Sequence, residues 1–274
     1  MSFWITGAAM SNQVAAATPT PLAVYTYHDR APYFSRVHQQ KLQQISTLEQ
    51  IAREQGMYQT LIGLINRQQQ DYLLELKYIP RKRLNSLLES GDWQGAVIGA
   101  NPQWFSDIGK RRYLWSRAIV HDRDVFVVRN NSIIKYQKPE DMMGRKLAMP
   151  RGFYYAGITE LVRQGHITTV ETSNALQDLR LLLSGRVEVA IMSPLTLAFF
   201  ERHFFRPDSF RRLPLPQAEF ARHLFFSPMS MAEYEQLQPV IDEVISGRDW
   251  HYYLLELGCQ VPSSARKTPL TPSC

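Results

Sequence analysis

The chain has 274 residues, of which 45% are hydrophobic, and this is enough for one large core or for two ordinary cores of roughly 100 to 150 residues each. Its 31 Lys and Arg residues outnumber 25 Asp and Glu residues, which gives a net charge of +6. The basic residues are scattered and do not form a dense run, so the sequence gives little support to nucleic-acid binding. Either a mildly basic surface or a cationic cleft for an anionic ligand accounts for the excess positive charge.

The N-terminal segment is similar to an export signal, although the usual basic start is missing. Phe3 to Met10 is apolar, Val14 to Ala17 is a run of small residues typical of a signal-peptidase site, and a Thr-Pro linker follows. We therefore expect residues 1–21 to be an export signal-like or disordered segment and the protein to be periplasmic. No later stretch reaches the roughly 20 apolar residues that a transmembrane helix needs.

The first half of the chain alternates between strand-like and helix-like segments. The sequence predicts, in order, a strand at 22–26, a helix at 42–66 with a break near Gly56, a strand at 73–79, a helix from Pro80 to Ser90 and a strand at 95–99. This order is typical of a parallel sheet with helices on its faces.

A second unit repeats part of this pattern. Ser90-Gly91 ends an amphipathic helix that a short apolar strand follows, and Ser184-Gly185 does the same 94 residues later. The first unit, from Leu84, ends at Pro102, and the second, from Leu179, ends at Pro194. Two such units predict two similar α/β lobes with a cleft between them, where small ligands usually bind.

The second lobe is expected to follow a crossing segment at 116–125. The sequence predicts strands at 125–129, 146–149, 168–171 and 187–192, helices at 154–164 and 175–183, a return crossing at 213–224, and final helices at 231–246 and 250–258. The expected domains are lobe 1 at 22–118 plus 220–262, lobe 2 at 122–216, and a flexible tail at 263–274.

Two cysteines, Cys259 and Cys274, lie near the C-terminus. They are too few for a metal site, and no cofactor or metal is expected. They could close a small loop over the Pro-rich tail in an oxidising compartment, or they could both be free thiols.

Taken in order and spacing, these pieces resemble the two-lobed periplasmic solute-binding proteins of the polar amino acid type, family 3. The matching pieces cover about residues 22 to 258 and are the opening strand with Pro32-Tyr33, the units at 84–99 and 179–192, the stretch 141–147, and Gly152. The resemblance implies an α/β fold of two doubly wound lobes, joined by a two-segment hinge, with a ligand cleft between them.

The resemblance also implies which positions contact a ligand. The loop after the first strand falls where the family has an aromatic wall, and residues 99–101 fall where it uses backbone groups and a small polar side chain. The turn at 150–153 falls where backbone amides at a helix start hold a carboxylate, as the helix dipole favours. The expected ligand contacts are Tyr27, His28, Tyr33, Asn101, Trp104, Arg151, Tyr154 and Ser193.

Two departures from the family pattern bear on the ligand. Near the family's carboxylate-gripping Arg this chain has Gly109 and Lys110, and Ser193 stands where the family has an Asp for the α-ammonium group. An ordinary amino acid would lack both ion-pair partners. Arg151 could replace the missing Arg from the opposite lobe, or it could be a solvated loop cation.

The expected function is therefore extracytoplasmic binding of a small polar or anionic solute, aromatic or not, by hinge closure. The expected partners are that small-molecule ligand and a membrane ABC importer or sensor. Nucleic acid is not expected as a partner, and the chain is expected to be a monomer.

Two rival functions stay open. One is a dehydratase-like periplasmic enzyme on the same scaffold, which would need a cleft acid or base, and the sequence offers His28, Asp29, Asp107 and Glu219. The other is a degenerate sensor module that binds a protein partner, its cleft filled by its own side chains.

Overall fold

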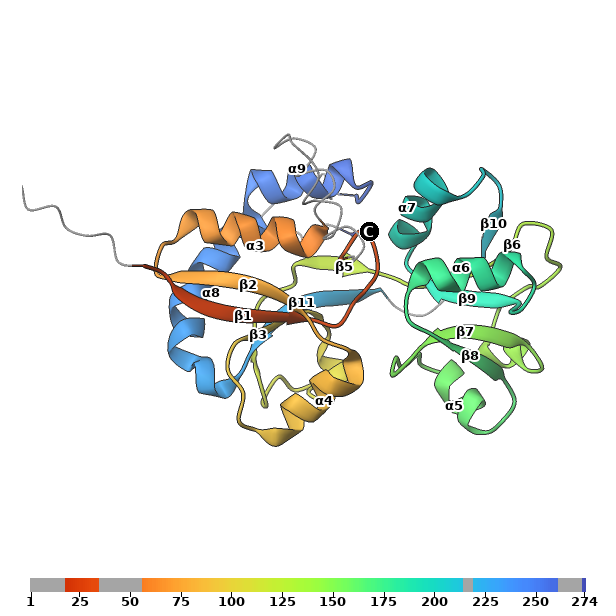
Figure 1. Cartoon of the computed structure of the whole chain (residues 1–274), viewed down its shortest axis with the longest axis horizontal. Coiled ribbons are helices and arrows are strands. Elements are labelled where there is room, and N and C mark those ends of the chain that lie inside the picture. The colour runs from red at the N-terminus through yellow and green to blue at the C-terminus, as the bar shows by residue number, and fades with distance from the viewer. Residues whose placement is uncertain (1–17, 35–55, 214–218, 261–272) are drawn as a thin grey trace, which may run out of the picture.

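The computed structural model describes residues 18–34, 56–213, 219–260 and 273–274, and it has two lobes, each built on its own sheet (Figure 1). In the described part of the chain, no helix combines the length and apolar character needed to cross a membrane. The expected export segment lies mostly outside the described residues, as do residues 42–55 of the expected first helix.

The first sheet contains the first five strands of the chain and the last one. Its order is β2-β1-β3-β11-β4, with β5 paired to β11, and the strands are β1 (Thr20–Thr26), β2 (Tyr72–Tyr78), β3 (Ala96–Ala100), β4 (Leu114–Trp115), β5 (Val120–Asp122) and β11 (Phe220–Phe226). β1 runs parallel to β2 and β3, and β11 runs antiparallel to β3.

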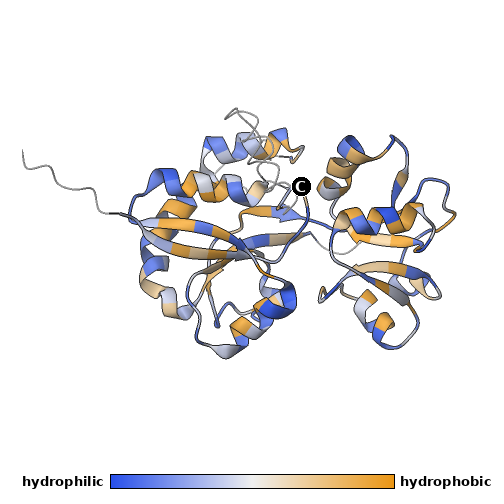
Figure 2. Ribbon diagram, viewed as in Figure 1, coloured by the Kyte–Doolittle hydropathy of each residue, from blue (hydrophilic) through white to orange (hydrophobic). Residues whose placement is uncertain are grey.

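Helices cover both faces of this sheet. One core cluster joins the sheet to the helices α3 (Met57–Gln68), α8 (Met231–Ser246) and α9 (Arg248–Glu256). Another cluster joins the opposite face to α4 (Arg81–Ser90) and to the 3-10 turn η1 (Pro102–Phe105). Figure 2 shows hydrophobic residues gathered on the strands and on the helix faces turned toward them.

The second sheet has the order β10-β6-β9-β7-β8. Its strands are β6 (Val125–Arg129), β7 (Lys146–Pro150), β8 (Thr168–Thr172), β9 (Val189–Met192) and β10 (Phe210–Leu213). The helices α6 (Ala175–Leu183) and α7 (Pro194–Phe204) pack on one face, and α5 (Ile158–Arg163) with the turn η2 (Pro139–Met142) packs on the other.

The two sheets correspond strand by strand, which confirms the two-lobed α/β fold. In each, two parallel pairs share a middle strand, β1 or β7, and an antiparallel strand follows on the far side of β3 or β9. The repeated Ser-Gly units supply the equivalent strands β3 and β9. Gly91 and Gly185 both have φ of 72°, a left-handed conformation that ends the preceding helix and that other residues rarely adopt.

The chain passes between the sheets at two places. Arg123 and Asp124 lie between β5 of the first sheet and β6 of the second. The return passage lies between β10 and β11, with residues 214–218 outside the described part. The expected return crossing at 213–224 is therefore too long, because β11 already pairs with β5 from Phe220 onward.

Several predicted bounds were wrong for local reasons. The helix expected at 154–164 is α5 and begins only at Ile158, because Gly157 before it has φ of 73° and Tyr155 N–H donates to Thr159 Oγ1 instead of entering the helix. Helix α7 and strand β10 were not predicted, and η3 (Pro228–Ser230) precedes α8. The bounds of α6 were predicted correctly, with Asn174 as the side-chain cap at its start.

The last two residues are held in place, although the sequence analysis expected a loose tail there. Cys274 is disulfide-bonded to Cys259, and its backbone N–H donates to the carbonyl of His121 at 2.8 Å. Ser273 exchanges two backbone hydrogen bonds with Gln260. The C-terminus therefore lies against strand β5, beside the first crossing.

Candidate functional site

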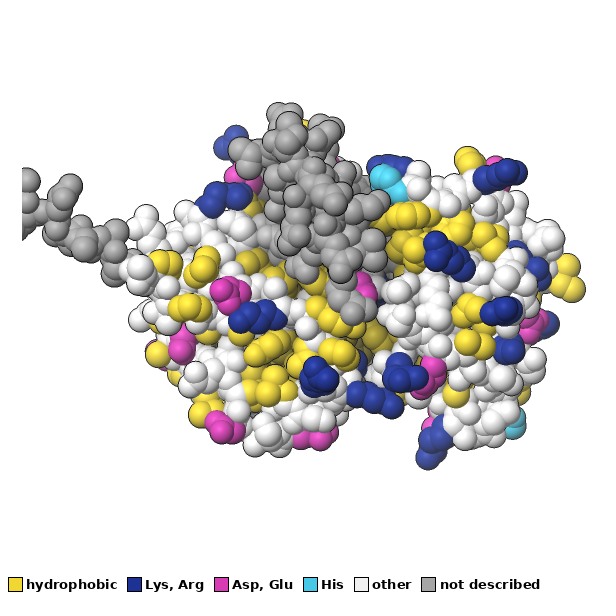
Figure 3. Space-filling model, in the orientation of Figure 1, with side chains coloured by type: hydrophobic (Ala, Val, Ile, Leu, Met, Phe, Trp, Pro, Cys, Tyr) yellow, Lys and Arg dark blue, Asp and Glu magenta, His cyan; other side chains and the backbone are white. Residues whose placement is uncertain are grey.

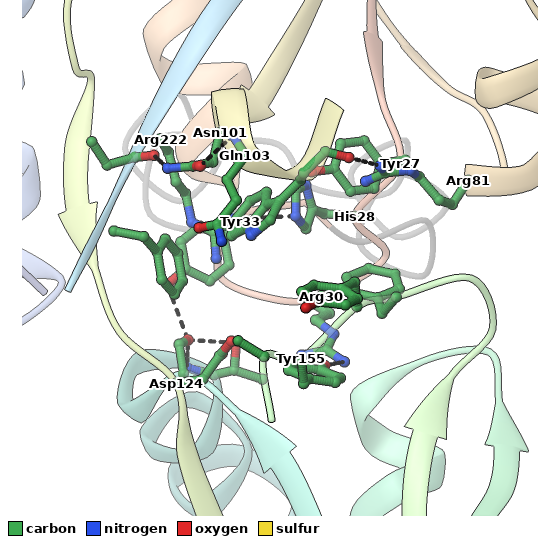
Figure 4. A pocket seen from close by; sticks show the side chains of 18 of the residues that line it. Tyr27, His28, Arg30, Tyr33, Arg81, Asn101, Gln103, Asp124, Tyr155 and Arg222 are labelled. Atoms are coloured by element: carbon green, nitrogen blue, oxygen red, sulfur yellow. Dashed lines mark hydrogen bonds between the residues drawn. The ribbon is translucent and has the colours of Figure 1, made fainter. Parts of the chain in front are cut away.

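A cavity of about 500 Å³ lies between the two lobes (Figure 4). Its volume is in the range typical of small-molecule sites. The first lobe and the crossings line it with Tyr27, His28, Arg30, Tyr33, Arg81, Asn101, Gln103, Trp104, Asp124, Glu219, Phe220, Ala221 and Arg222, and the second lobe adds Phe153, Tyr154, Tyr155, Ala156, Ser193 and Thr196.

The topology explains why these residues meet. Most follow the carboxyl ends of the parallel strands β1 and β3 in the first sheet and β7 and β9 in the second. Such ends form the usual ligand crevice of open α/β sheets. The remaining ones come from the start of β11, from the crossing residues Asp124 and Glu219, or from the start of α4.

Arg222, on β11, is a buried arginine on the first-lobe side of the cavity. Its Nε and Nη2 contact Asp122 Oδ2 at 2.8 and 2.7 Å, and its guanidinium lies 4.5 Å from the centre of the Tyr33 ring. Its Nη1 is 3.0 Å from His28 Nε2. The pair with Asp122 neutralises this guanidinium and fixes its orientation.

His28 is held as a neutral imidazole. Burial first, and then the charges of Arg222, Arg30 and Arg81, lower the pKa of His28 well below its usual value. Since Arg222 can only donate, His28 Nε2 accepts and the proton is on Nδ1, which has no hydrogen-bond partner among the described residues. A neutral, orienting histidine is a poor general acid at neutral pH.

Two contacts join the lobes across the cavity. The Tyr33 hydroxyl donates to Asp122 Oδ2 at 2.6 Å and lies 3.0 Å from Ser193 Oγ of the second lobe. Arg30 extends from the loop after β1 to Tyr155, as Figure 4 shows, with 3.2 Å between its Nη2 and the Tyr155 hydroxyl. The lobes are therefore closed on one another.

Arg81, at the first position of α4, brings a further cation to the cavity. Its hydrogen bonds go to neutral acceptors, the Asn85 side chain and the Trp104 carbonyl, and its guanidinium lies 4.7 Å from the Tyr27 ring centre. Its stem faces Gly152 of the second lobe, where an added Cβ would be 3.5 Å from Arg81 Cγ. Figure 3 shows Lys and Arg side chains gathered on this face, where α4 meets the loop after β7.

The structure brings most of the sequence-predicted residues to the cavity. The seven that line it are Tyr27, His28, Tyr33, Asn101, Trp104, Tyr154 and Ser193. Arg151 is not in the lining, because its Nε donates to Glu171 Oε2 at 2.6 Å on the exposed side of β8. Lys110 is exposed and also outside the lining, so it does not replace the family's Arg.

Of the acidic residues near the cavity, Asp107 has a structural role, whereas Glu219 and Asp124 line the cavity. Asp107 accepts the backbone N–H groups of residues 111–113 and the indole N–H of Trp115, and these bonds together lower its pKa although burial raises it. Glu219 is exposed at the cavity. Asp124 was not singled out from the sequence, and burial, then the charge of Asp122, raises its pKa to about 6. Among the described residues no cluster of His, Cys, Asp and Glu could hold a metal ion.

Solved structures share this architecture, although no protein-family model and no curated protein matches the sequence. An ancestral arginine-binding protein bound to arginine has a TM-score of 0.66 and 12% identity, over 88% of this chain and 99% of its own. The arginine-specific periplasmic binding protein of Salmonella typhimurium has a TM-score of 0.61 and 15% identity, over 86% and 98%. This chain has the fold of an amino acid ABC transporter substrate-binding protein.

A third solved structure also shares this architecture. It comes from work on glutathione import in Streptococcus mutans and has a TM-score of 0.63 and 14% identity, over 88% of this chain and 93% of its own. At such identities the likeness shows the fold, and the ligand of this chain has to be argued from its own cavity.

Proposed function

We propose that this chain is an extracytoplasmic binding protein that closes its two lobes around a small polar or anionic solute. The observation that supports this most is the cavity of about 500 Å³ at the carboxyl ends of β1 and β3 in the first lobe and of β7 and β9 in the second. The solute contacts are Tyr27, His28, Tyr33, Asn101, Trp104, Tyr154 and Ser193, with Arg81 added to the sequence-predicted set.

Closure works through the two crossings. In this proposal lobe 1 comprises residues 22–118 with 220–262, and lobe 2 comprises residues 122–216, except that strand β5 (Val120–Asp122), which pairs with β11, moves with lobe 1. The solute bridges the lobes and favours the closed form, which a membrane importer or sensor then recognises. The neighbouring structures include proteins of ABC importers, and this supports the importer as partner of a monomeric chain.

The state of the two cysteines agrees with an oxidising compartment. Cys259 and Cys274 form a disulfide, and disulfides persist outside the cytoplasm. Together with the export signal-like start, this supports a periplasmic location.

Arg81 supports an anionic group on the solute. Arg222 is already paired with Asp122, whereas the hydrogen bonds that Arg81 makes to described residues go to neutral acceptors and leave its charge for a carboxylate or similar group. The aromatic rings of Tyr27 and Trp104 give such a solute a flat surface to pack against.

A solute panel tests the proposal. Amino acids, organic acids and small peptides are added, and thermal unfolding and small-angle scattering are recorded. A solute at 100 times its Kd should stabilise the protein by about 2.7 kcal/mol. If the whole panel leaves the unfolding temperature and the scattering curve unchanged, the binding function is contradicted.

A matched pair of variants then tests the site. Arg81→Gln should weaken solute binding at least about tenfold, because the cationic group that faces the anion is lost. Arg83→Gln, on the same helix but exposed, should bind like the wild type. Equal binding by both variants would place the solute elsewhere.

One observation favours the enzyme as a second candidate. Asp124 lines the cavity with a pKa raised to about 6, which suits a general acid. Turnover of cyclohexadienyl acids by the wild type, lost in Asp124→Asn, would establish it. We expect no turnover, since no base stands out beside Asp124 and the lone pair of His28 Nε2 is already engaged by Arg222.

A further inference from the structure

The loop after β1 belongs to the first lobe, yet two of its residues are embedded in the second. Ala31 is buried in the core cluster of α6 and α7. Arg30 is 7% exposed, and its guanidinium contacts groups from β9, α6 and the loop before α5. The first lobe therefore places a charged side chain inside the second lobe.

The groups around this guanidinium are those that a guanidinium binds. Its Nη1 donates to the Ile191 carbonyl at 3.3 Å, and its Nη2 donates to the Tyr155 hydroxyl at 3.2 Å. Its flat face lies 5.0 Å from the centre of the Phe153 ring. A carboxylate completes the site, with 4.0 Å between Arg30 Nη2 and Asp178 Oδ2. Carbonyl, hydroxyl, aromatic face and carboxylate together suit a planar cation.

Asp178 gives an independent sign that this is a cation site. Its carboxylate, near the start of α6, is 0% exposed, and neither oxygen makes a well-formed hydrogen bond among the described residues. Burial raises the pKa of Asp178, and the Thr172 hydroxyl lies close enough to offset part of this rise. The neighbouring Arg30 is its cation, but at 4.0 Å the two make an ion pair without a hydrogen bond. Such a carboxylate has unused capacity for a cation that can approach it more closely.

We propose that Asp178, Tyr155 and the Ile191 carbonyl form a guanidinium-binding subsite of the second lobe. Arg30 occupies this subsite and holds the lobes together, as the cationic group of a ligand would. A solute that enters the remaining cavity then needs no cationic group of its own to bridge the lobes. This inference depends only on contacts within the chain and stands apart from the solute-binding function.

The test uses the full chain without any added solute. Arg30→Ala should increase the radius of gyration and lower the unfolding temperature, because the contact across the cleft is lost. Millimolar methylguanidinium should then raise the unfolding temperature of this variant by about 2 to 4 °C, with no effect on the wild type, and it should leave the lobes open because it is not attached to the first lobe. The same concentration of sodium chloride controls for ionic strength.

Three further variants sharpen the test. Arg151→Ala removes an exposed arginine paired within the second lobe, so it should neither open the lobes nor respond to methylguanidinium. Arg30→Ala combined with Asp178→Asn should lose the response. Arg30→Met keeps a long unbranched side chain without the guanidinium and serves if Arg30→Ala does not fold, and it should open the lobes in the same way.

Two results would overturn the proposal. One is an unchanged radius of gyration in both Arg30 variants. The other is a methylguanidinium response that is absent in Arg30→Ala, or equally large in Arg151→Ala. Either result leaves the solute panel free to succeed or fail by itself.

Discussion

Two buried arginine–aspartate pairs flank the cavity, and they are built differently. Arg222 and Asp122 come from adjacent strands of one sheet and meet at 2.7 and 2.8 Å, with the Tyr33 hydroxyl on the same carboxylate oxygen. Arg30 and Asp178 come from different lobes, are 4.0 Å apart, and share no hydrogen bond. The first pair is part of the folded lobe, whereas the second depends on how the lobes are placed.

The difference shows which charges a hinged protein can fix. A pair within one sheet keeps its geometry when the lobes separate, so its desolvation is compensated in every state. A pair across the cleft is compensated only in the closed state, and its energy therefore acts on the closed–open equilibrium.

Removing Asp122 should have the largest effect on stability. Asp122→Ala leaves the Arg222 guanidinium buried without its partner, which should cost about 3 to 5 kcal/mol of unfolding free energy. Urea unfolding of the variant and the wild type measures it. A loss below about 1 kcal/mol would mean that the pair contributes as little as an exposed one.

Asp178 should show its burial in the pH dependence of stability. Desolvation raises its pKa from 3.8 to about 6, so the folded state binds the proton more tightly than the unfolded state does. Stability from this group is fully present below pH 3.8 and is lost as the pH rises through about 6, a loss of up to about 3 kcal/mol.

Asp178→Asn should lack this decline, because the amide does not titrate. Urea unfolding at several pH values between 4 and 7 compares the two proteins. A stability difference that stays constant over this range, or that grows in favour of the wild type as the pH rises, would contradict the burial of an ionisable Asp178.

Smaller losses of stability are expected for Tyr33 and Tyr155, each of which contacts one of the two pairs. Tyr33→Phe should lower the unfolding free energy by about 1 to 3 kcal/mol, since it removes a hydrogen bond to the buried Asp122 carboxylate and leaves that acceptor with one partner fewer. Tyr155→Phe should cost about 1 kcal/mol and should loosen the lobes in scattering, because Arg30 loses an acceptor. The Tyr33 hydroxyl also contacts Ser193 across the cleft, so both variants should loosen the lobes, and the larger loss of unfolding free energy in Tyr33→Phe separates them. Equal losses of unfolding free energy would remove the distinction between the pairs.

The smallest effect is expected at the exposed pair of Arg151 and Glu171, whose side chains are 65% and 54% exposed. Glu171→Ala should change the unfolding free energy by less than about 1 kcal/mol, since solvent screens such pairs. A loss as large as that of Asp122→Ala would show that exposure does not explain the ranking.

The fold could be predicted from the sequence because its signals are local. Asn174 caps α6, and Ser184-Gly185 ends it, within one short stretch of chain. Helix α7 was not predicted although Ser193 caps it and Pro194 begins it, since a Pro directly after an apolar strand is also a common way for a strand to end.

The site was predicted in part, for a physical reason. Tyr27, His28 and Tyr33 follow a recognisable strand, so their place at its carboxyl end can be inferred. Arg222 contacts Gly99 and Asp122 from more than 90 residues away, and Arg30 contacts Asp178 from another lobe. Their pairing depends on the strand order and on lobe closure, which no local pattern reports.

A crystal structure of the protein as purified, with no solute added, tests the central claim most directly, because such a cleft can retain a solute from the cell. The account predicts density for a small molecule in the cavity, in contact with Arg81 from the first lobe and with Tyr154 or Ser193 from the second. A cavity collapsed onto its own side chains, with the solute panel also negative, would contradict it.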